Sequence, residues 1–406
     1  MVYNRFMKRI HTAIIGGGAS GLILAAALQQ FNQQTVALFE RGERLGKKLS
    51  ATGNGQGNLT NRNLSTAAYF SQSGIPSKRL ESILQRYDDT SFCAFLKEMG
   101  LLCFTDERGR VYPSGRQASS ITDALRFIVA QKGVQTYTQT QIIRLEKTNG
   151  EFVLTSADNT QYRAENVVLC TGGKAAKNFG TDGSAYALAQ SFGHTLTALT
   201  PSLVQLKTQT QTIKTLKGIR VTDGVLTAEW QGGKHTLRGD VIFTDYGVSG
   251  DAVFRISAYV ANQWEKGATL YLDFLPDYTE DEIYAALQTK TERFPALPFE
   301  ERLGGIVNNQ VGRAVMKTVK NGDNRAAAKA VKRFPLVITG TLGFDYAQVT
   351  KGGIPLREMD ESLQSTCAKN LYFAGEIIDV DGACGGYNLQ WAYASARVVA
   401  DAIKGK

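Results

Sequence analysis

Residues that bind metals or form cross-links are scarce in this sequence. Its 406 residues include 5 cysteines and 3 histidines. The cysteines form no Cys-x-x-Cys pair, and none has a histidine at metal-binding spacing. Their positions are Cys93, Cys103, Cys170, Cys367 and Cys384. This pattern argues against zinc, iron–sulfur and disulfide-framework proteins, so we expect no metal site.

Long apolar runs are also missing. No stretch reaches the length of a transmembrane helix, and the first residues lead directly into an apolar strand pattern instead of a cleavable leader. We therefore expect a cytoplasmic protein that does not enter a membrane. With 43% hydrophobic residues the chain can still build a large core, and its length predicts two or three domains.

Acidic residues are fewer than basic ones, which gives a net charge of +9. The basic residues are dispersed, and their densest group, between residues 313 and 333, follows a helical pattern without interleaved aromatic side chains. A solvated surface explains this distribution better than a nucleic-acid-binding face does, so a nucleic-acid partner is a minor alternative.

Residues 10–40 have the pattern of a dinucleotide-binding βαβ unit. An apolar strand enters the turn GGGASG, an alanine-rich helix pattern follows, and a second apolar strand ends at Glu40. Gly16 permits the tight turn, Gly18 lets backbone amides approach a pyrophosphate, and Gly21 lets the helix lie close to the strand. The Glu40 carboxylate can accept the hydroxyls of an adenosine ribose, whereas the 2′-phosphate of NADP would meet like charge there.

The loop of residues 41–61 is too rich in Gly, Asn and Thr to form regular structure. A loop of this length after the second strand is unusual and suggests a function. Its backbone amides, with Lys47 or Lys48, are placed to follow the ribityl and diphosphate part of a long cofactor. A flexible surface loop is the alternative interpretation.

Two later segments repeat the strand-then-glycine pattern. A buried strand over residues 167–170 ends on Thr171, Gly172 and Gly173, and a strand over residues 371–374 ends on Gly375 and Glu376. The second is followed by a glycine-lined loop and a long helix from Tyr387, whose N-terminal amides can face the pyrimidine edge of a flavin. Three distant segments that touch one ligand favour FAD over NAD, and no second complete dinucleotide fingerprint occurs.

Between these segments the sequence pattern changes twice. Residues 203–274 alternate polar and apolar residues between glycine turns, which predicts antiparallel β structure. Residues 281–294, 300–320 and 325–332 have helical patterns, and Thr279 with Glu282 forms a predicted capping box before the first of them. Strand character returns over residues 335–349.

Together these motifs resemble a known family. The segments that carry the resemblance are GGGASG, KKLSATGNGQGNLTN, RVYPS, LCTGG, FGTDGSAYALAQSFGH, FTDYGVSG, VTKGGI and YFAGEIIDVDGACGGYNLQWAYAS. Taken in this order over almost the whole chain, they are similar to the bacterial FAD-binding flavoprotein family that includes aminoacetone oxidase and BaiN/YhiN-like proteins. One departure is visible: many members read TGGGRCN where this chain has Gln56 and Gly57 in place of Arg and Cys, so a mechanism that uses that cysteine is not open to it.

The resemblance implies an α/β fold: a glutathione-reductase-like FAD-binding Rossmann domain, interrupted by an inserted β-barrel-like domain and a small helical domain. The predicted boundaries are residues 1–195 and 356–406 for the FAD-binding domain, 196–275 for the β-rich domain, 276–333 for the helical domain and 334–355 for the return strands.

We expect FAD to bind without a covalent link, and the site residues come from every motif above. The residues expected to bind it are Gly16, Gly18, Ala19, Ser20, Gly21, Glu40, Arg41, Lys47, Lys48, Thr52, Gly53, Asn54, Gly55, Gln56, Asn58, Ile142, Thr171, Gly172, Gly173, Gly375, Glu376, Asp379, Gly386, Tyr387, Asn388 and Gln390. The sequence identifies no catalytic base.

The predicted activity is that of an FAD-dependent oxidoreductase with a small-molecule substrate. Because no second nucleotide fold is present to dock NAD(P)H, we expect an oxidase of a small amine or amino-ketone with O2 as acceptor. NAD(P)H can bind without such a fold, so an NAD(P)H-dependent reductase of activated C=C bonds is the alternative. A flavin-containing nucleic-acid-binding protein is the minor one.

Overall fold

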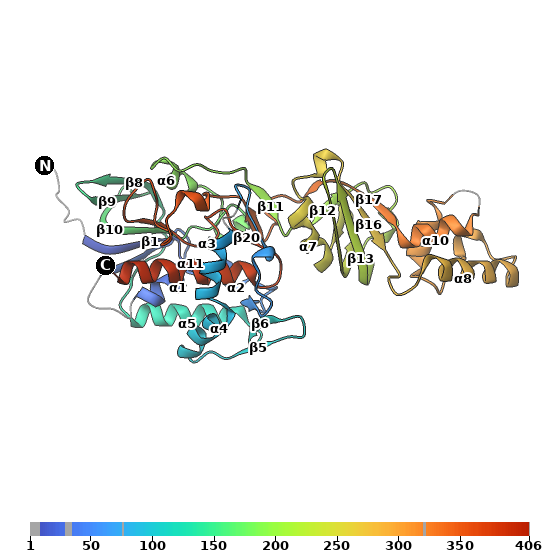
Figure 1. The fold of residues 1–406 in the computed structure, drawn as a ribbon, viewed down its shortest axis with the longest axis horizontal. Coiled ribbons are helices and arrows are strands. Elements are labelled where there is room, and N and C mark those ends of the chain that lie inside the picture. Colours follow the sequence, from blue (N-terminus) through green and yellow to red (C-terminus); the bar gives the residue numbers. More distant parts are fainter. Residues whose placement is uncertain (1–8, 29–34, 75–76, 320–321, 406) are drawn as a thin grey trace. The chain divides into compact units, whose positions relative to one another are not determined.

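The computed structural model describes residues 9–28, 35–74, 77–319 and 322–405, and the chain forms two compact units (Figure 1). Residues 1–200 and 349–406 belong to the first unit, and residues 201–348 belong to the second. The sequence placed these boundaries near residues 195 and 356 and separated the helical segment from the barrel. Parts of two predicted helices, residues 29–31 and 320, lie outside the described residues.

The first unit is built on a seven-stranded sheet whose centre is parallel. β1 (Arg9–Ile15) lies between β2 (Val36–Phe39) and β10 (Gln161–Leu169), β7 (Gln135–Tyr137) follows β2, and β19 (Leu371–Phe373) pairs with β10. β8 (Ile142–Thr148) and β9 (Glu151–Ser156) extend the sheet in antiparallel fashion. Ile15 is in register with Phe39 and Leu169, and Leu169 with Phe373, so four strands end at one edge.

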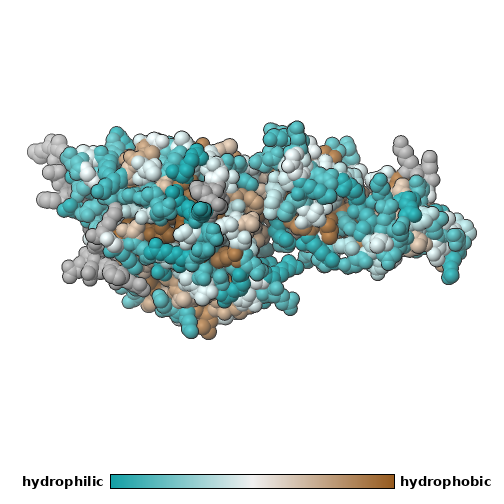
Figure 2. Space-filling model, in the orientation of Figure 1, coloured by the Kyte–Doolittle hydropathy of each residue, from teal (hydrophilic) through white to brown (hydrophobic). Residues whose placement is uncertain are grey.

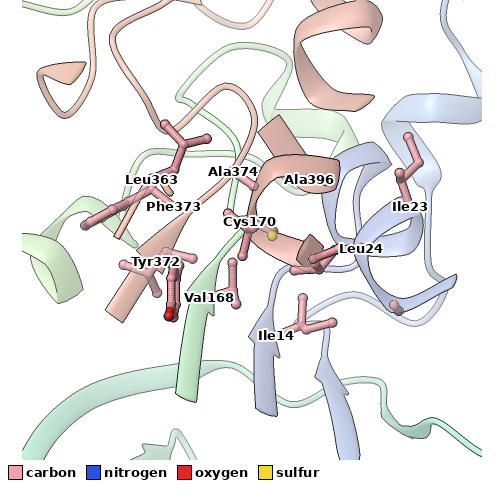
Figure 3. Packing of buried hydrophobic residues seen from close by; sticks show 14 of the residues in the cluster. Ile14, Ile23, Leu24, Val168, Cys170, Leu363, Tyr372, Phe373, Ala374 and Ala396 are labelled. Atoms are coloured by element: carbon pink, nitrogen blue, oxygen red, sulfur yellow. The ribbon is translucent and has the colours of Figure 1, made fainter. Parts of the chain in front are cut away.

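Helix α1 (Ala19–Leu28) packs against α11 (Tyr387–Lys404) and α5 (Ala118–Gln131), and almost all of its side chains are buried. Its small alanines allow this close approach on several sides. Figure 3 shows Leu24 of α1 above Ile14 of β1, with Val168 of β10 and Cys170, which follows that strand, alongside. The core of this unit therefore lies directly beneath the ends of the parallel strands.

Shorter elements complete the first unit. They are α2 (Lys47–Ser50), β3 (Thr60–Asn61), η1 (Thr66–Ala68), β4 (Tyr69–Phe70), α3 (Ser77–Arg86), α4 (Asp89–Glu98), β5 (Cys103–Thr105), β6 (Arg110–Pro113), η2 (Lys177–Phe179), α6 (Tyr186–Gln190), η6 (Leu356–Glu358) and β20 (Asp381–Gly382). α3 and α4 are separate helices, because Asp88 accepts the Ser91 N–H and starts α4. A turn with Gln139 at φ 52° separates β7 from β8.

The second unit contains a closed six-stranded barrel. In order around the barrel, its strands are β12 (Leu206–Thr208), β15 (Gly247–Ser249), β14 (Gly233–Phe243), β13 (Arg220–Trp230), β16 (Thr269–Asp273) and β17 (Phe334–Thr341). Helix α7 (Asp251–Val260) lies within the segment predicted to be all β, and it packs against β14. β11 (Thr200–Ser202) and β18 (Val349–Lys351) lie where the chain passes between the units.

Helices α8 (Glu280–Arg293), α9 (Asn309–Met316) and α10 (Asn324–Lys332) share one apolar cluster with the barrel. Short 3-10 turns connect the elements of this unit: η3 (Lys214–Leu216), η4 (Trp264–Lys266) and η5 (Phe299–Glu301). The predicted helix of residues 300–320 begins only at Asn309, since the chain turns at Gly305 (φ 75°) and Asn308 caps the helix that follows.

The described helices include none that is long and apolar enough to cross a membrane. On the face drawn in Figure 2, hydrophilic residues cover most of the surface of each unit, and the apolar areas between them are small.

The capping box predicted at the start of α8 is confirmed: the Thr279 hydroxyl accepts the Glu282 N–H, and the Glu282 carboxylate accepts the Thr279 N–H. We predict that Thr279→Ala destabilises the first turn by about 1 kcal/mol, which speeds amide hydrogen exchange at residues 281–283 roughly fivefold. Thr289→Ala is the control, because its hydroxyl bonds Ala285 within the same helix. Unchanged exchange in Thr279→Ala would contradict the assigned role.

Candidate functional site

The glycine turn after β1 is held by contacts that leave no room for a side chain at two positions. A Cβ on Gly16, whose φ is 106°, would lie 2.4 Å from the Cys170 carbonyl oxygen. A Cβ on Gly21 would lie 1.9 Å from the Gly16 carbonyl oxygen. At Gly18, by contrast, a Cβ would have no neighbour within 4 Å. Gly16 and Gly21 are therefore required for packing, whereas Gly18 leaves the N-terminus of α1 open to a ligand.

Ala19 and Ser20 form the first turn of α1 beside the C-terminal segment of the chain. The Ser20 hydroxyl donates to the Ala374 carbonyl at 3.3 Å, and a Cβ on Gly375 would lie 2.6 Å from that hydroxyl. The turn after β19 thus lies directly against the dinucleotide turn, as the sequence motifs required.

Glu40 is fixed by the backbone. One carboxylate oxygen accepts the Gly17 N–H at 2.9 Å, and the other accepts the Gly42 N–H at 2.7 Å. Each oxygen retains a lone pair, so the oriented carboxylate can still accept the two hydroxyls of a ribose. The Glu40 carbonyl also accepts the Thr140 N–H, which ties the segment leading into Ile142 to this position.

Arg41, which follows Glu40, donates hydrogen bonds to Asp182 at 2.8 Å and to Ser184 at 3.3 Å. Although burial raises the pKa of Asp182, the hydrogen bonds from Arg41 and Ser184 lower it to about 2. Arg41 is thereby held against a residue of the segment that follows β10, which restricts where its guanidinium can reach.

The loop of residues 47–58 folds on itself. The Thr52 hydroxyl donates to the Leu49 carbonyl at 2.7 Å, and a Cβ on Gly53 would lie 2.9 Å from the Asn58 nitrogen. Gly55 has open space around it, and three side chains of the loop are exposed. The exposed residues are Lys47, Asn54 and Gln56.

Lys48 leaves this loop to meet the C-terminal segment. Its ammonium lies 2.8 Å from a Glu376 oxygen, and the other Glu376 oxygen accepts the Thr350 N–H, also at 2.8 Å. This ion pair joins two predicted site residues that are 328 positions apart in the chain.

The crossing after β10 is equally crowded. Gly172 has φ 70°, and a Cβ on Gly173 would lie 2.4 Å from the Thr350 hydroxyl. That hydroxyl accepts the N–H groups of Lys174 and Ala175 at 2.7 and 2.8 Å. The Thr171 hydroxyl is buried and has no hydrogen-bond partner within the described part of the chain, which is the condition expected of a group that meets a ligand.

Two predicted site residues have all their hydrogen bonds within the protein. Asp379 is fully buried and accepts bonds from the loop of residues 71–73 at 2.7 to 2.9 Å. Gln390, also fully buried, accepts from Thr60 and donates to the Tyr87 carbonyl. Their side chains thus anchor the loop of residues 71–73 and α11, and their contact with FAD stays a prediction.

The turn into α11 lies against β3. A Cβ on Gly386 (φ 99°) would lie 2.4 Å from the Thr60 carbonyl oxygen and 2.8 Å from the Asn58 side chain. Asn388 accepts from the Gly382 N–H and donates to the Gly382 carbonyl, both at 2.8 Å, and the Tyr387 hydroxyl donates to the Asn63 carbonyl at 3.2 Å. These bonds fix the loop before α11 and leave the first amides of this 18-residue helix without helical acceptors.

The residues at this edge fit FAD. An oriented carboxylate at Glu40 follows β2, open space at Gly18 follows β1, and a buried Thr171 hydroxyl without a partner among the described residues follows β10. The N-terminus of α11 lies in the C-terminal segment that follows β19. The described residues hold no cluster of His, Cys, Asp or Glu that could bind a metal ion.

Sequence reasoning missed three residues of this site. Thr350 ties the segments after β10 and β19 together, and the partly exposed Lys351 and the buried Asp381 attract each other beside them. Thr350 and Lys351 stand in VTKGGI, a segment noted only for its resemblance, so the motif was the available signal.

Comparisons with known proteins agree with this geometry. A model of the HI0933-like protein Rossmann domain matches residues 10–402. The 3-dehydro-bile acid delta(4,6)-reductase of Clostridium scindens is 36% identical over 96% of this chain and 97% of its own. The ribosomal RNA dihydrouridine synthase of Haemophilus influenzae is 30% identical over the same shares of the two chains. The structure of 3-ketosteroid delta1-dehydrogenase from Sterolibacterium denitrificans, at 13% identity, shares the fold with a TM-score of 0.54 over 98% of this chain and 99% of that chain.

The different surroundings of the turn glycines lead to a test. We predict that Gly18→Ala leaves the stability of the apoprotein unchanged but raises the Kd for FAD at least about tenfold, equivalent to about 1.4 kcal/mol, because the methyl group occupies ligand space. Gly21→Ala should instead lower the free energy of unfolding by about 1–3 kcal/mol, because its methyl group overlaps the Gly16 carbonyl.

Flavin fluorescence titration and denaturant unfolding of the apoprotein measure the two effects. Gly115→Ala is the matched control, since a Cβ there also has open space and Gly115 follows β6, a strand of a different sheet. Wild-type FAD affinity in Gly18→Ala would contradict the assignment.

Proposed function

The chain belongs to the HI0933-like protein family of Rossmann-domain proteins and is an FAD-dependent oxidoreductase, and from that premise we propose that it reduces carbon–carbon double bonds conjugated to a carbonyl group, with NAD(P)H as electron donor. The match over residues 10–402 confirms the predicted family, the FAD-binding Rossmann fold and the FAD cofactor. The substrate, the electron donor and the non-covalent attachment of FAD belong to the proposal.

The observation that carries this proposal is the shared chemistry of two relatives. One is named a delta(4,6)-reductase of a 3-dehydro bile acid, and the other is named for making dihydrouridine in ribosomal RNA. Dihydrouridine is uridine with two hydrogens added to a C=C bond that is conjugated to a carbonyl. Both names therefore describe saturation of an activated double bond, although the molecules that carry the bond differ greatly in size.

The charges of the second unit favour a small substrate over RNA. Arg313, Arg325 and Arg333 of the basic group each pair with a carboxylate: Glu301, Asp281 and Glu229. Cations already paired within the protein release few counterions when they meet phosphates, so they contribute little to RNA affinity. We therefore propose a carbonyl compound of steroid size or smaller as the substrate.

Within the proposed reaction, FAD when bound supplies hydride transfer. The residues of the chain bind and orient it. Glu40 accepts the ribose hydroxyls, the open N-terminus of α1 favours the diphosphate, and the N-terminus of α11 stabilises negative charge at the pyrimidine edge.

The amine or amino-ketone oxidase expected from the sequence remains a prediction. Its main support was the missing second nucleotide fold, and transient binding of NAD(P)H needs no such fold. The same holds for the predicted cytoplasmic location and for O2 as acceptor.

Anaerobic mixing of the flavin-loaded protein distinguishes the two reactions. We predict that NAD(P)H bleaches the visible flavin absorbance and that a 3-oxo-4-ene steroid then restores it, while the steroid is converted to its saturated ketone. Aminoacetone should leave the oxidised spectrum unchanged. The saturated ketone is the control acceptor, because it lacks the double bond. Bleaching by the amino-ketone but not by NAD(P)H would contradict the proposal and support the oxidase.

A further inference from the structure

A carboxyl group without a hydrogen-bond partner is buried next to the candidate site. Asp381 of β20 is 1% exposed, and neither of its carboxylate oxygens has a hydrogen-bond partner among the residues that the structure describes. Buried polar groups are almost always hydrogen-bonded, and an unpaired buried charge is costly. Packing alone therefore does not explain why a carboxyl group is buried at Asp381.

Lys351 of β18 is the cation that faces this carboxyl. Its ammonium lies 4.7 Å from the centre of the Phe70 ring, and Phe70 is the cross-strand partner of Asp381 in the β4–β20 pair. Burial lowers the pKa of Lys351, while attraction to Asp381 and Asp379 opposes that shift. Asp381 is buried, whereas Lys351 is partly exposed. A proton that passes from one to the other therefore moves between the interior and the surface of the site.

The neighbouring acids have partners of their own. Asp379 accepts bonds from residues 71–73, and Glu376 accepts from Lys48 and Thr350. Burial raises the pKa of Asp381, Lys351 lowers it, and repulsion by Asp379 and Glu376 raises it further, which leaves it at about 7.

Two tyrosines lie on the elements packed against Asp381. Tyr69 of β4 and Tyr387 of α11 lie on elements packed against it, and burial raises the pKa of both phenols. Both tyrosines therefore stay neutral near pH 7, where Asp381 can exchange a proton with Lys351.

The pair also lies at the edge where FAD is expected. Thr350, which precedes Lys351, bonds the backbone after β10 and Glu376 after β19. Asp381 precedes Gly382, whose amide and carbonyl bond Asn388 in the first turn of α11. Both residues are thus placed by the segments that form the candidate site.

We propose that Lys351 is the proton donor of the reaction and that Asp381 is the positioning residue that restores its proton, an inference that rests on the proposed function. FAD, when bound and reduced by NAD(P)H, would supply the hydride, with its electron pair, that the β-carbon of the conjugated double bond takes up. The resulting enolate oxygen is held by the Lys351 ammonium, and its α-carbon takes one proton from that ammonium. The product is the saturated ketone.

After proton donation, Lys351 and Asp381 can return to their initial protonation states. After Lys351 becomes a neutral amine, the protonated Asp381 carboxyl returns a proton to it, which creates an ammonium–carboxylate pair in the buried pocket. The carboxylate then takes a proton from solvent. One hydride and one proton are thereby added to the substrate, and both residues return to their initial states.

The first test follows the reoxidation of reduced enzyme by a 3-oxo-4-ene steroid under anaerobic stopped flow. We predict that Lys351→Met slows reoxidation about 100-fold, the range of a lost general acid, while bleaching by NAD(P)H stays within about twofold of wild type. Steady-state turnover of the wild type with NAD(P)H and the steroid should fall as the pH rises through about 7, because Asp381 loses there the proton that it returns to Lys351 after each reduction. Asp381→Asn should remove that inflection. Reoxidation by Lys351→Met at the wild-type rate would overturn the proposal.

The second test separates binding of the enolate oxygen from donation of the proton, and it does not depend on turnover. Para-chlorophenolate is the enolate analogue, and its Kd for oxidised holoenzyme is read from the change in the flavin spectrum. We predict that Lys351→Met weakens this binding at least tenfold. Lys351→Arg should keep the binding but reoxidise as slowly as Lys351→Met, because a guanidinium retains its proton.

Lys147→Met is the matched control, since Lys147 also lies over an aromatic ring, 4.9 Å from the centre of Phe152, and burial also lowers its pKa. If neither NAD(P)H nor the steroid changes the flavin spectrum, the proposed function fails. The binding of para-chlorophenolate then remains as the test of the role of Lys351 and Asp381. Loss of binding in Lys351→Met but not in Lys147→Met would then support it, and equal or absent binding would overturn it. Bound FAD and circular dichroism of each variant confirm folding.

Discussion

The structure of the first unit depends on one close approach, in which the start of α1 lies against the turn that leaves β1. The distance is so short that a methyl group on Gly21 would lie 1.9 Å from the Gly16 carbonyl oxygen. Because the helix is held there, its N-terminus points at the edge where β1, β2, β10 and β19 end in register. The segments that form the candidate site depend on this alignment, because it brings the ends of the four strands together.

This alignment explains how segments far apart in the chain form one site. Ser20 bonds Ala374 and Lys48 pairs with Glu376, contacts that span more than 300 positions. The chain between them leaves for the second unit at Thr200 and returns at Val349. β19 is the strand that pairs with β10 after the chain has returned from the second unit. It needs only the part of β10 that β9 leaves unpaired, so the parallel sheet tolerates the insertion.

Local patterns in the sequence were sufficient to predict the glycine turn, the position of Glu40 and the capping box of Thr279. Each of these depends on residues that are close together in the chain or at a fixed spacing. Partners across long distances could not be predicted. Asp379 and Gln390 were expected at the cofactor, but they bond the loop of residues 71–73 and Thr60, whose positions only the fold determines. Asp381 stands in a segment that carries the family resemblance, but only the fold shows that its carboxyl is buried without hydrogen-bond partners among the described residues. Helix α7 was missed since its apolar residues, read between two strands, also fit a strand pattern.

The central claim is that the segments after β1, β10 and β19, with the loop after β2, hold one FAD molecule. Hydrogen exchange of the apoprotein before and after addition of one equivalent of FAD tests this directly. The account predicts slower exchange in residues 17–22, 52–58, 171–175 and 385–389 together, with saturation at one FAD per chain. Slower exchange confined to residues 17–22, or no uptake of FAD, would contradict it.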